Sequence, residues 1–322
     1  MIKPVSPVTA ASNRFVAERM AAARELGERL PTLVADPEAF AVALGRGFTS
    51  LADPGYADGV RSVTPGLGPV FGVRQPLMEA THKAFRRGTK QTPPAQLLDC
   101  VARLFHEERR EMRWFGIWIL GRTLPADPDR AWQLLREAAA AADEWITVDT
   151  LAHPYGEGIL RDPGRWAELD RLVGSSSRWE RRLVGSTLAT MPHVNFPGGG
   201  DKVFVRHGLS LIVRLIGDAE PDVQKALSWA LRTFAALDRS AVEDFLTTEA
   251  LTARRTQDGN RAWVIRDTLP KLPEDTATRL RFSLDGIRRR PGTPSTSIAA
   301  AASRPAADLD RAATTALRST AP

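Results

Sequence analysis

Apolar residues recur every three or four positions along almost the whole 322-residue chain. The longest such run covers residues 95–124, and shorter runs cover 130–142 and 223–237. This spacing places apolar side chains on one face of an α-helix. Asp, Ser, Pro and Gly stand where such helices would begin and end, and convincing pairs of strands joined by short hairpin turns are absent. The sequence therefore predicts an all-α protein.

The expected helices come in pairs with a rough period of 35 to 50 residues, as estimated from known helical repeats, and the pairs share little sequence identity. Degenerate helix pairs of this kind stack into an α-solenoid. A solenoid curves and leaves a long concave face, which can hold an extended partner, either protein or nucleic acid.

Three segments are expected along the chain. Residues 1–60 form N-terminal helices, and residues 61–287 form the repeat domain, which we expect to be continuous with them. The segment 288–322 is basic and rich in Pro, Ala, Ser and Thr, which predicts a disordered tail. The Gly-rich stretch 193–208 interrupts the helical pattern and is interpreted as an insertion between helices.

The composition excludes several classes of protein. Cys100 is the only cysteine, so disulfide frameworks and cysteine-rich zinc sites are excluded. No run of about 18 uncharged apolar residues is present, which argues against a membrane-spanning helix. The N-terminus lacks the apolar core of a signal peptide, and we expect a cytoplasmic monomer, associated with the nucleoid when bound to DNA. A net charge of +6 is compatible with a polyanionic partner.

The usual catalytic motifs are missing from the sequence. It contains no phosphate-binding loop of the G-x-x-x-x-G-K-[ST] type, no H-E-x-x-H helix and no G-x-S-x-G elbow. The five histidines are scattered, so neither a metal site nor a cofactor is expected. Any catalysis must therefore depend on a few polar groups.

The stretch "DEWITVDTLAH" spaces Trp145 and Asp149 four residues apart, which places ring and carboxylate on one face of a helix. A Trp packed between helices and a solvated Asp would give the same pattern. Two later stretches add aromatic rings and cations at helical spacing, namely Trp179 with Arg182, and Trp229 with Lys225 and Arg232. Separately, each is compatible with a core ring beside a solvated cation. Together they suit a polyanion-binding groove with one acidic reaction centre.

In order and spacing, these stretches resemble the AlkD-like DNA glycosylases, which are built from HEAT-like helical repeats. The resemblance covers about residues 70–275 and includes "FGVRQPLMEA", "HEERREMRWFGIWIL", "DEWITVDTLA", "RWERRLVG" and "VQKALSWALR". It implies that the concave face binds double-stranded DNA containing alkylated bases. The implied reaction hydrolyses the N-glycosidic bond of cationic purines, chiefly N3-methyladenine and N7-methylguanine and possible bulky N3 or N7 adducts, with no base-enclosing pocket.

The resemblance also implies roles for individual residues. Asp149 corresponds to the catalytic aspartate, and Trp145 and Trp229 correspond to rings that line the deoxyribose. Arg182 corresponds to a phosphate-contacting arginine, with Arg181 as the alternative if the register slips by one. The further candidate DNA contacts are Arg232, Lys225, and the patch Lys83, Arg86, Arg87 and Lys90, for which a solvated helix face is an equal alternative.

A carboxylate and aromatic rings suffice for this reaction because a cationic base is already a good leaving group. The departing base leaves positive charge on the sugar, and both groups interact favourably with that charge. Two other readings stay open. One is a non-catalytic relative that binds branched or distorted DNA, and the other is a scaffold for a protein partner, which would bury the tryptophans.

Overall fold

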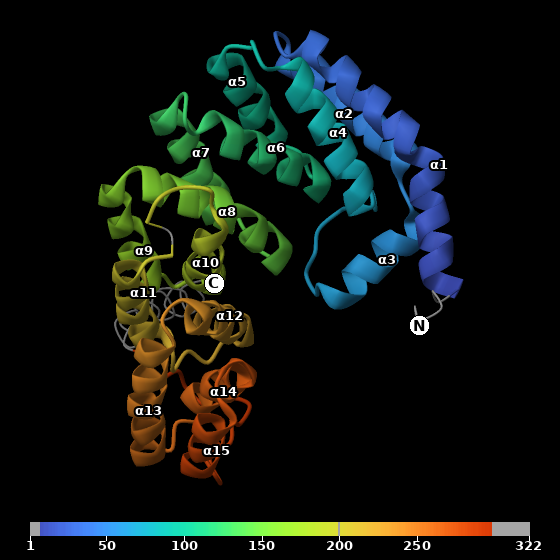
Figure 1. Cartoon of the computed structure of the whole chain (residues 1–322). Coiled ribbons are helices and arrows are strands. Elements are labelled where there is room, and N and C mark those ends of the chain that lie inside the picture. The colour runs from blue at the N-terminus through green and yellow to red at the C-terminus, as the bar shows by residue number, and fades with distance from the viewer. Residues whose placement is uncertain (1–6, 199, 298–322) are drawn as a thin grey trace, which may run out of the picture. The chain divides into compact units, whose positions relative to one another are not determined.

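The computed structural model describes residues 7–198 and 200–297. These residues form fifteen α-helices, joined in places by short 3-10 turns, and their only β feature is an isolated bridge between Ala52 and Val73 (Figure 1). The predictions of an all-α protein and of a solenoid of helix pairs are confirmed. The first helices are α1 (Pro7–Arg29), α2 (Pro37–Leu51), α3 (Pro54–Val63), α4 (Gln75–Gly88), α5 (Pro94–Phe105), α6 (Arg110–Thr123) and α7 (Pro128–Ala140). The later ones are α8 (Trp145–Arg161), α9 (Trp166–Val173), α10 (Arg178–Thr190), α11 (Lys202–Leu215), α12 (Pro221–Leu237), α13 (Arg239–Thr256), α14 (Gly259–Thr268) and α15 (Glu274–Ser283).

The chain divides into two compact units, Met1–Ala138 and Ala139–Pro322. The boundary predicted at residues 60 and 61 lies inside the first unit. Helices on both sides of that boundary share one core, because α1 packs against α4 and α2 packs against α5. Residues on both sides of 60 and 61 thus belong to one compact unit, and the predicted domain division stays a prediction.

The first unit is held together by aromatic side chains and by one buried carboxylate. The ring of Phe115 lies 6.0 Å from that of Phe48 and 5.8 Å from that of Phe85, measured between centroids. Glu111 is buried and accepts hydrogen bonds from the backbone N–H groups of Phe71, Gly72 and Val73. These hydrogen bonds satisfy backbone N–H groups in the segment between α3 and α4, where no helix supplies acceptors for them.

The second unit contains an ordered row of four helices, in which α10 packs between α8 and α12, and α12 packs against α14. A second set of helices lies against this row, with α11 in contact with α9 and α13. The close approach of α10 to α12 depends on Gly185, where an added Cβ would lie 2.8 Å from atoms of Ala226. The row positions side chains from four helices on neighbouring surfaces, and it carries the candidate site.

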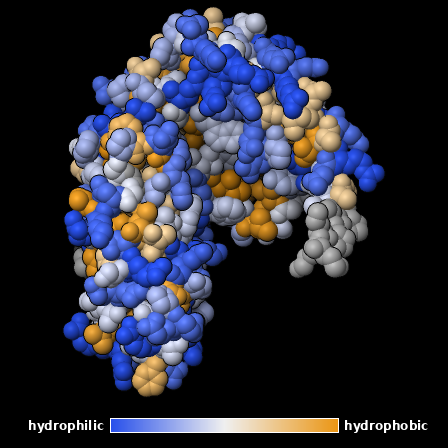
Figure 2. Space-filling model, viewed as in Figure 1, coloured by the Kyte–Doolittle hydropathy of each residue, from blue (hydrophilic) through white to orange (hydrophobic). Residues whose placement is uncertain are grey.

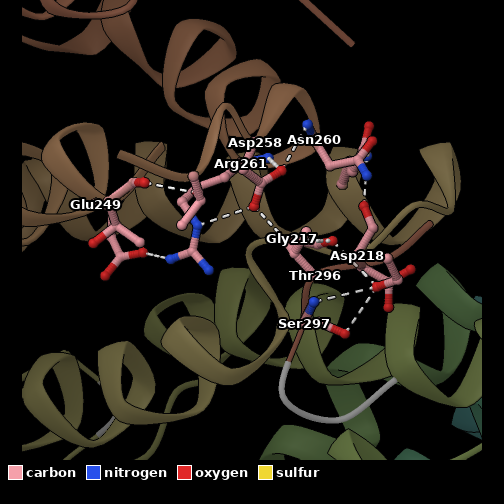
Figure 3. A network of polar contacts seen from close by, with 12 residues as sticks. Gly217, Asp218, Glu249, Asp258, Asn260, Arg261, Thr296 and Ser297 are labelled. Carbon is pink, nitrogen blue, oxygen red and sulfur yellow. Dashed lines mark hydrogen bonds and ion pairs between the residues drawn. The ribbon is translucent and has the colours of Figure 1, made fainter. Parts of the chain in front are cut away.

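The segment 288–297 packs against the second unit (Figure 3). The Thr296 N–H donates to the Gly217 carbonyl at 2.9 Å, and the Thr296 hydroxyl donates to Asp258. Arg289 donates to the Gln224 side chain at 2.8 Å. The prediction of a disordered tail from residue 288 is therefore wrong for 288–297, because this segment forms specific hydrogen bonds with polar groups of the second unit. Residues 298–322 lie outside the described residues.

The predicted insertion at 193–208 is partly helical. Its Gly-rich half lies in the connection between α10 and α11, and α11 begins at Lys202 with Asp201 as its N-cap. The Asp201 carboxylate accepts from the Phe204 N–H at 2.7 Å, which is the usual way to satisfy a free donor in a first helical turn.

The face of the protein seen in Figure 2 is mainly polar. Figure 2 shows hydrophilic side chains over most of the visible face of both units, with hydrophobic side chains gathered over α3. Within the described residues, no helix combines the length and apolar character needed to cross a membrane.

Candidate active site on helices α8, α10 and α12

Helix α8 begins at Trp145 because Glu144 caps it. The buried Glu144 carboxylate accepts hydrogen bonds from the N–H groups of Ile146 and Thr147, the latter at 2.8 Å. Trp145 is therefore the first residue of the helix, and Asp149 follows one turn later on the same face. Both side chains are partly exposed. The predicted pairing of ring and carboxylate on one face of a helix is present.

The Asp149 carboxylate is held by two side chains of α10. Arg182 donates from Nε to Oδ1 at 3.1 Å and from Nη2 to Oδ2 at 2.8 Å, and Ser186 donates from Oγ to Oδ1 at 2.7 Å. The Arg182 side chain is 7% exposed, whereas that of Asp149 is 23% exposed. The carboxylate is therefore held by buried side chains of α10 but remains partly accessible to solvent. A charge fixed in this way needs little reorganisation when a positive centre develops next to it.

Arg182 also connects the site to α12. Its Nη1 donates to the main-chain oxygen of Asp222 at 2.8 Å, so all three guanidinium nitrogens have acceptors within the protein. Sequence analysis predicted a phosphate contact for Arg182. The structure instead shows an arginine that orients Asp149 and links three helices, and the phosphate contact stays a prediction.

Trp229 lies on the face of α12 that borders this link. It follows Asp222 by seven residues, or about two helical turns, and is partly exposed. Because Arg182 joins Asp222 to Asp149, the helices that carry Trp229 and Asp149 are coupled through α10. The structure thus places the predicted residues Trp145 and Asp149 on α8 and Trp229 on α12, with α10 packed between these two helices.

Arg181, the alternative to Arg182, is directed into the protein. It is buried and donates to both oxygens of Asp218, and its Nη1 donates to the main-chain oxygens of Ser175 and Ser176. Arg181 thus has buried partners within the protein, and its role as an alternative DNA contact stays a prediction. Its position one residue from Arg182 turns it by about 100° around the helix, into the polar network at the start of α12.

Two further predicted contacts lie on α12 and differ from each other. Arg232 donates from Nη1 to Asp267, both to its main-chain oxygen at 2.9 Å and to its carboxylate, so it joins α12 to α14. Lys225 is exposed, lies one turn before Trp229 and makes no ion pair with a described residue. Lys225 is thus the cation of this face that is free to meet a phosphate, while Arg232 already has a carboxylate partner.

The four remaining predicted contacts lie in the first unit. Lys83, Arg86, Arg87 and Lys90 are exposed, on α4 or just after it. Lys83 and Arg86 line a pocket with His82 and Trp118. Burial, reinforced by the positive charges of Arg86 and Arg122, lowers the pKa of His82 to about 4. Near neutral pH, the positive charge of this patch therefore comes from its lysine and arginine side chains.

The W-x-x-x-D spacing occurs twice more, as Trp166 and Asp170 on α9 and as Trp263 and Asp267 on α14, and sequence analysis did not single out either. Trp263 and Asp267 lie one turn apart on α14. The Ser228 hydroxyl lies 2.6 Å from Asp267 Oδ2, and Arg232, four residues after Ser228, pairs with the same carboxylate. We call Asp149, Arg182 and Ser186 the α8 cluster, and Asp267, Arg232 and Ser228 the α14 cluster.

Sequence analysis also missed Ser186 and Asp222. A signal for Ser186 was present, because it follows Arg182 by four residues and must share its face of the helix. Asp222 contributes its backbone oxygen, and its carboxylate Oδ1 lies 4.0 Å from Arg182 Nη1. No group of three His, Cys, Asp or Glu side chains in the described part of the chain is arranged to hold a metal ion.

The fold and the α8 cluster define a class of protein, namely a helical-repeat protein with an oriented carboxylate on α8 and partly exposed tryptophans on α8 and α12. The family model described as DNA alkylation repair enzyme matches residues 44–270, and the chain belongs to that family. The match includes the α8 cluster and the whole of α10, α12 and α14. No curated protein matches the sequence.

Proposed function

We propose that this DNA alkylation repair enzyme is a glycosylase that hydrolyses the N-glycosidic bond of cationic alkylated purines in duplex DNA. The C1′–N bond breaks, and its electron pair leaves with the base, which becomes neutral. Water then adds its oxygen to C1′ and loses a proton. N3-methyladenine, N7-methylguanine and bulky N3 or N7 adducts share the required positive charge.

The observation that carries the proposal is the orientation of Asp149. A carboxylate held by a bidentate arginine and a serine keeps its direction without its substrate. Positive charge develops on the sugar as the base departs, and a fixed negative group next to it stabilises the transition state more than the ground state. The carboxylate also provides an acceptor for the proton of the attacking water.

The tryptophans support the same role. Trp145 and Trp229 are partly exposed, so their ring faces are available to a sugar that becomes cationic. A protein-interaction scaffold would bury these rings in the packing between helices. Lys225, exposed one turn from Trp229, and the basic patch of α4 would contact DNA phosphates.

A non-catalytic DNA-binding relative is the second candidate, and one observation favours it. An Asp149–Arg182 ion pair that only ties α8 to α10 would show the same hydrogen bonds. Such a protein would bind damaged duplex with a steep dependence on salt but release no base.

The test is a single-turnover excision assay on duplexes that carry N7-methylguanine, a larger N7 adduct or uracil. Neither Arg182 nor Ser186, the partners of Asp149, can protonate a departing base at neutral pH. We therefore expect release of both cationic lesions and no useful release of uracil. Binding without release of any base would support the non-catalytic candidate, and efficient uracil release would contradict the proposed chemistry.

The size of the alkyl group on the lesion provides a second test of the proposal. If the reaction takes place at the sugar and the base is not enclosed, the larger N7 adduct is released as readily as the methyl adduct. Rejection of the larger adduct alone would leave the carboxylate mechanism standing and would show an enclosed base.

We further propose that the protein acts as a monomer in the cytoplasm, bound to the nucleoid.

A further inference from the structure

Ser186 is a buried polar residue on the face of α10 that packs against α8. Its side chain is fully buried, and its hydroxyl donates to Asp149 Oδ1 at 2.7 Å. Arg182 lies one turn earlier on α10 and holds the same carboxylate. The two side chains approach Asp149 from one helix, so the carboxylate is clamped against α10.

The hydrogen bonds divide unequally between the two carboxylate oxygens. Each oxygen has about two lone-pair positions for accepting hydrogen bonds. Among the described residues, Oδ1 of Asp149 accepts from Arg182 Nε and from Ser186 Oγ, whereas Oδ2 accepts only from Arg182 Nη2. Oδ1 is therefore fully used within the protein, and Oδ2 retains one position.

We propose that Ser186 is a positioning residue that saturates Oδ1 of Asp149 and thereby directs Oδ2 to the reacting sugar. This inference rests on the proposed glycosylase function. Arg182 alone permits the carboxylate to rock in the plane of the bidentate pair. The serine hydroxyl removes that freedom, because it approaches the second lone-pair position of one oxygen.

The protein contains a matched control for this role. Ser228 is also fully buried, and its hydroxyl lies 2.6 Å from the Asp267 carboxylate, which Arg232 holds as well. Removing the Ser186 hydroxyl takes one donor from Asp149. Removing the Ser228 hydroxyl takes one donor from Asp267 and also the acceptor of a 3.2 Å hydrogen bond from Arg232 Nη1. The effect on stability should be similar for the two serines, but only Ser186 acts on the proposed reaction centre.

The experiment compares Ser186→Ala with Ser228→Ala in the full chain. We expect single-turnover excision of N7-methylguanine to fall about tenfold in Ser186→Ala, since a small misplacement of a reacting group has a large effect on rate. The dissociation constant for the same duplex should not change. Ser228→Ala should excise at the wild-type rate, and Ser186→Thr, which keeps the hydroxyl, should recover most of the lost rate if thermal unfolding shows that it folds.

A double-mutant cycle with Asp149→Asn separates positioning from general destabilisation. If Ser186 acts through the carboxylate, Ser186→Ala should cause no further loss of rate once Asp149 is Asn. An additive loss, or equal losses in Ser186→Ala and Ser228→Ala, would overturn the inference. So would normal excision by Ser186→Ala together with a large loss in Asp149→Asn, which would leave the proposed function intact. Normal excision by Asp149→Asn would instead refute the proposed function itself.

Discussion

The α8 and α14 clusters are built from the same three residue types, yet they hold their carboxylates differently. In each, a tryptophan precedes the aspartate by one helical turn, and a serine and an arginine four residues apart on a neighbouring helix contact the carboxylate. In the α8 cluster, Arg182 binds both oxygens of Asp149. In the α14 cluster, Arg232 binds one carboxylate oxygen and the main-chain oxygen of Asp267.

Exposure separates the clusters further. The side chains of Asp149 and Arg182 are 23% and 7% exposed, whereas those of Asp267 and Arg232 are 41% and 29% exposed. A charge next to protein rather than water interacts more strongly with a developing cation. The α8 cluster is therefore the better reaction centre, and the α14 cluster resembles a surface ion pair that joins two helices.

The tryptophans of the two clusters also differ in their partners. The guanidinium carbon of Arg289 lies 5.6 Å from the centre of the Trp263 ring, so a cation of the chain itself already occupies that face. Trp145 has no such cation among the described residues. An open ring next to an oriented carboxylate can accept an external positive charge. The W-x-x-x-D spacing alone therefore does not define a site, because the residues around the ring and the carboxylate determine whether an external cation can approach them.

Replacing the aspartates should give the largest difference in excision rate between variants of the two clusters. Asp149→Asn keeps the size of the side chain and removes the charge, so base release should fall at least about a hundredfold. Duplex affinity should not fall, because a charge that repels phosphates is lost. Asp267→Asn should excise within about twofold of wild type on the same electrostatic argument. The measurement is single-turnover release of N7-methylguanine, and equal losses in both variants would erase the distinction.

The arginines provide the next largest contrast. Arg182→Ala leaves Asp149 without its main partner and should lower the free energy of unfolding by about 2 kcal/mol, less than for a fully buried pair because Asp149 is partly hydrated. Arg232→Ala should cost about 0.5 kcal/mol, as an exposed pair does. Urea unfolding measures both values.

Arg182→Ala also distinguishes its two candidate roles. If Arg182 mainly orients Asp149, excision should slow by more than about tenfold, given one decade per 1.4 kcal/mol, while the salt dependence of duplex binding stays the same. If it mainly holds a phosphate, binding should weaken on damaged and undamaged duplex alike, and the salt slope should fall by about one unit. Weaker binding with a lower salt slope would support the phosphate contact that the family resemblance implies for Arg182.

The tryptophans should show a smaller difference. Trp145→Leu keeps apolar bulk but removes the ring face, and the loss of a cation–π contact of about 1 kcal/mol should slow excision about fivefold. Trp263→Leu loses only its contact with Arg289, so excision should be unchanged. A loss in Trp263→Leu as large as that in Trp145→Leu would show that the second ring also faces the substrate.

The sequence predicted what depends on local periodicity. The helices, and the shared face of Trp145 and Asp149, follow from spacing along one helix. The partners of the carboxylate could not be predicted in the same way, because Arg182 and Ser186 reach it from another helix. Arg181 shows the same limit, since one residue of register decides whether an arginine faces Asp149 or the buried Asp218.

The segment 288–297 is ordered, contrary to the prediction from its composition, for a related reason. Its composition is typical of a disordered tail, but composition does not report acceptors on the rest of the protein. Here the Gly217 carbonyl and the Asp258 carboxylate bind Thr296. The contacts of Arg289 with Gln224 and Trp263 belong to this same segment.

The smallest expected effect concerns the cations next to each cluster, Lys225 and Arg289. Lys225 is exposed and unpaired among the described residues, so a DNA phosphate can use its full charge. Arg289 is exposed but already donates to Gln224 and covers the Trp263 ring. Lys225→Ala should therefore lower the slope of log affinity against log salt by about one unit, and Arg289→Ala by clearly less. Fluorescence anisotropy on undamaged duplex over a range of salt concentrations measures both slopes. A larger change for Arg289→Ala would show that DNA extends over the α14 cluster.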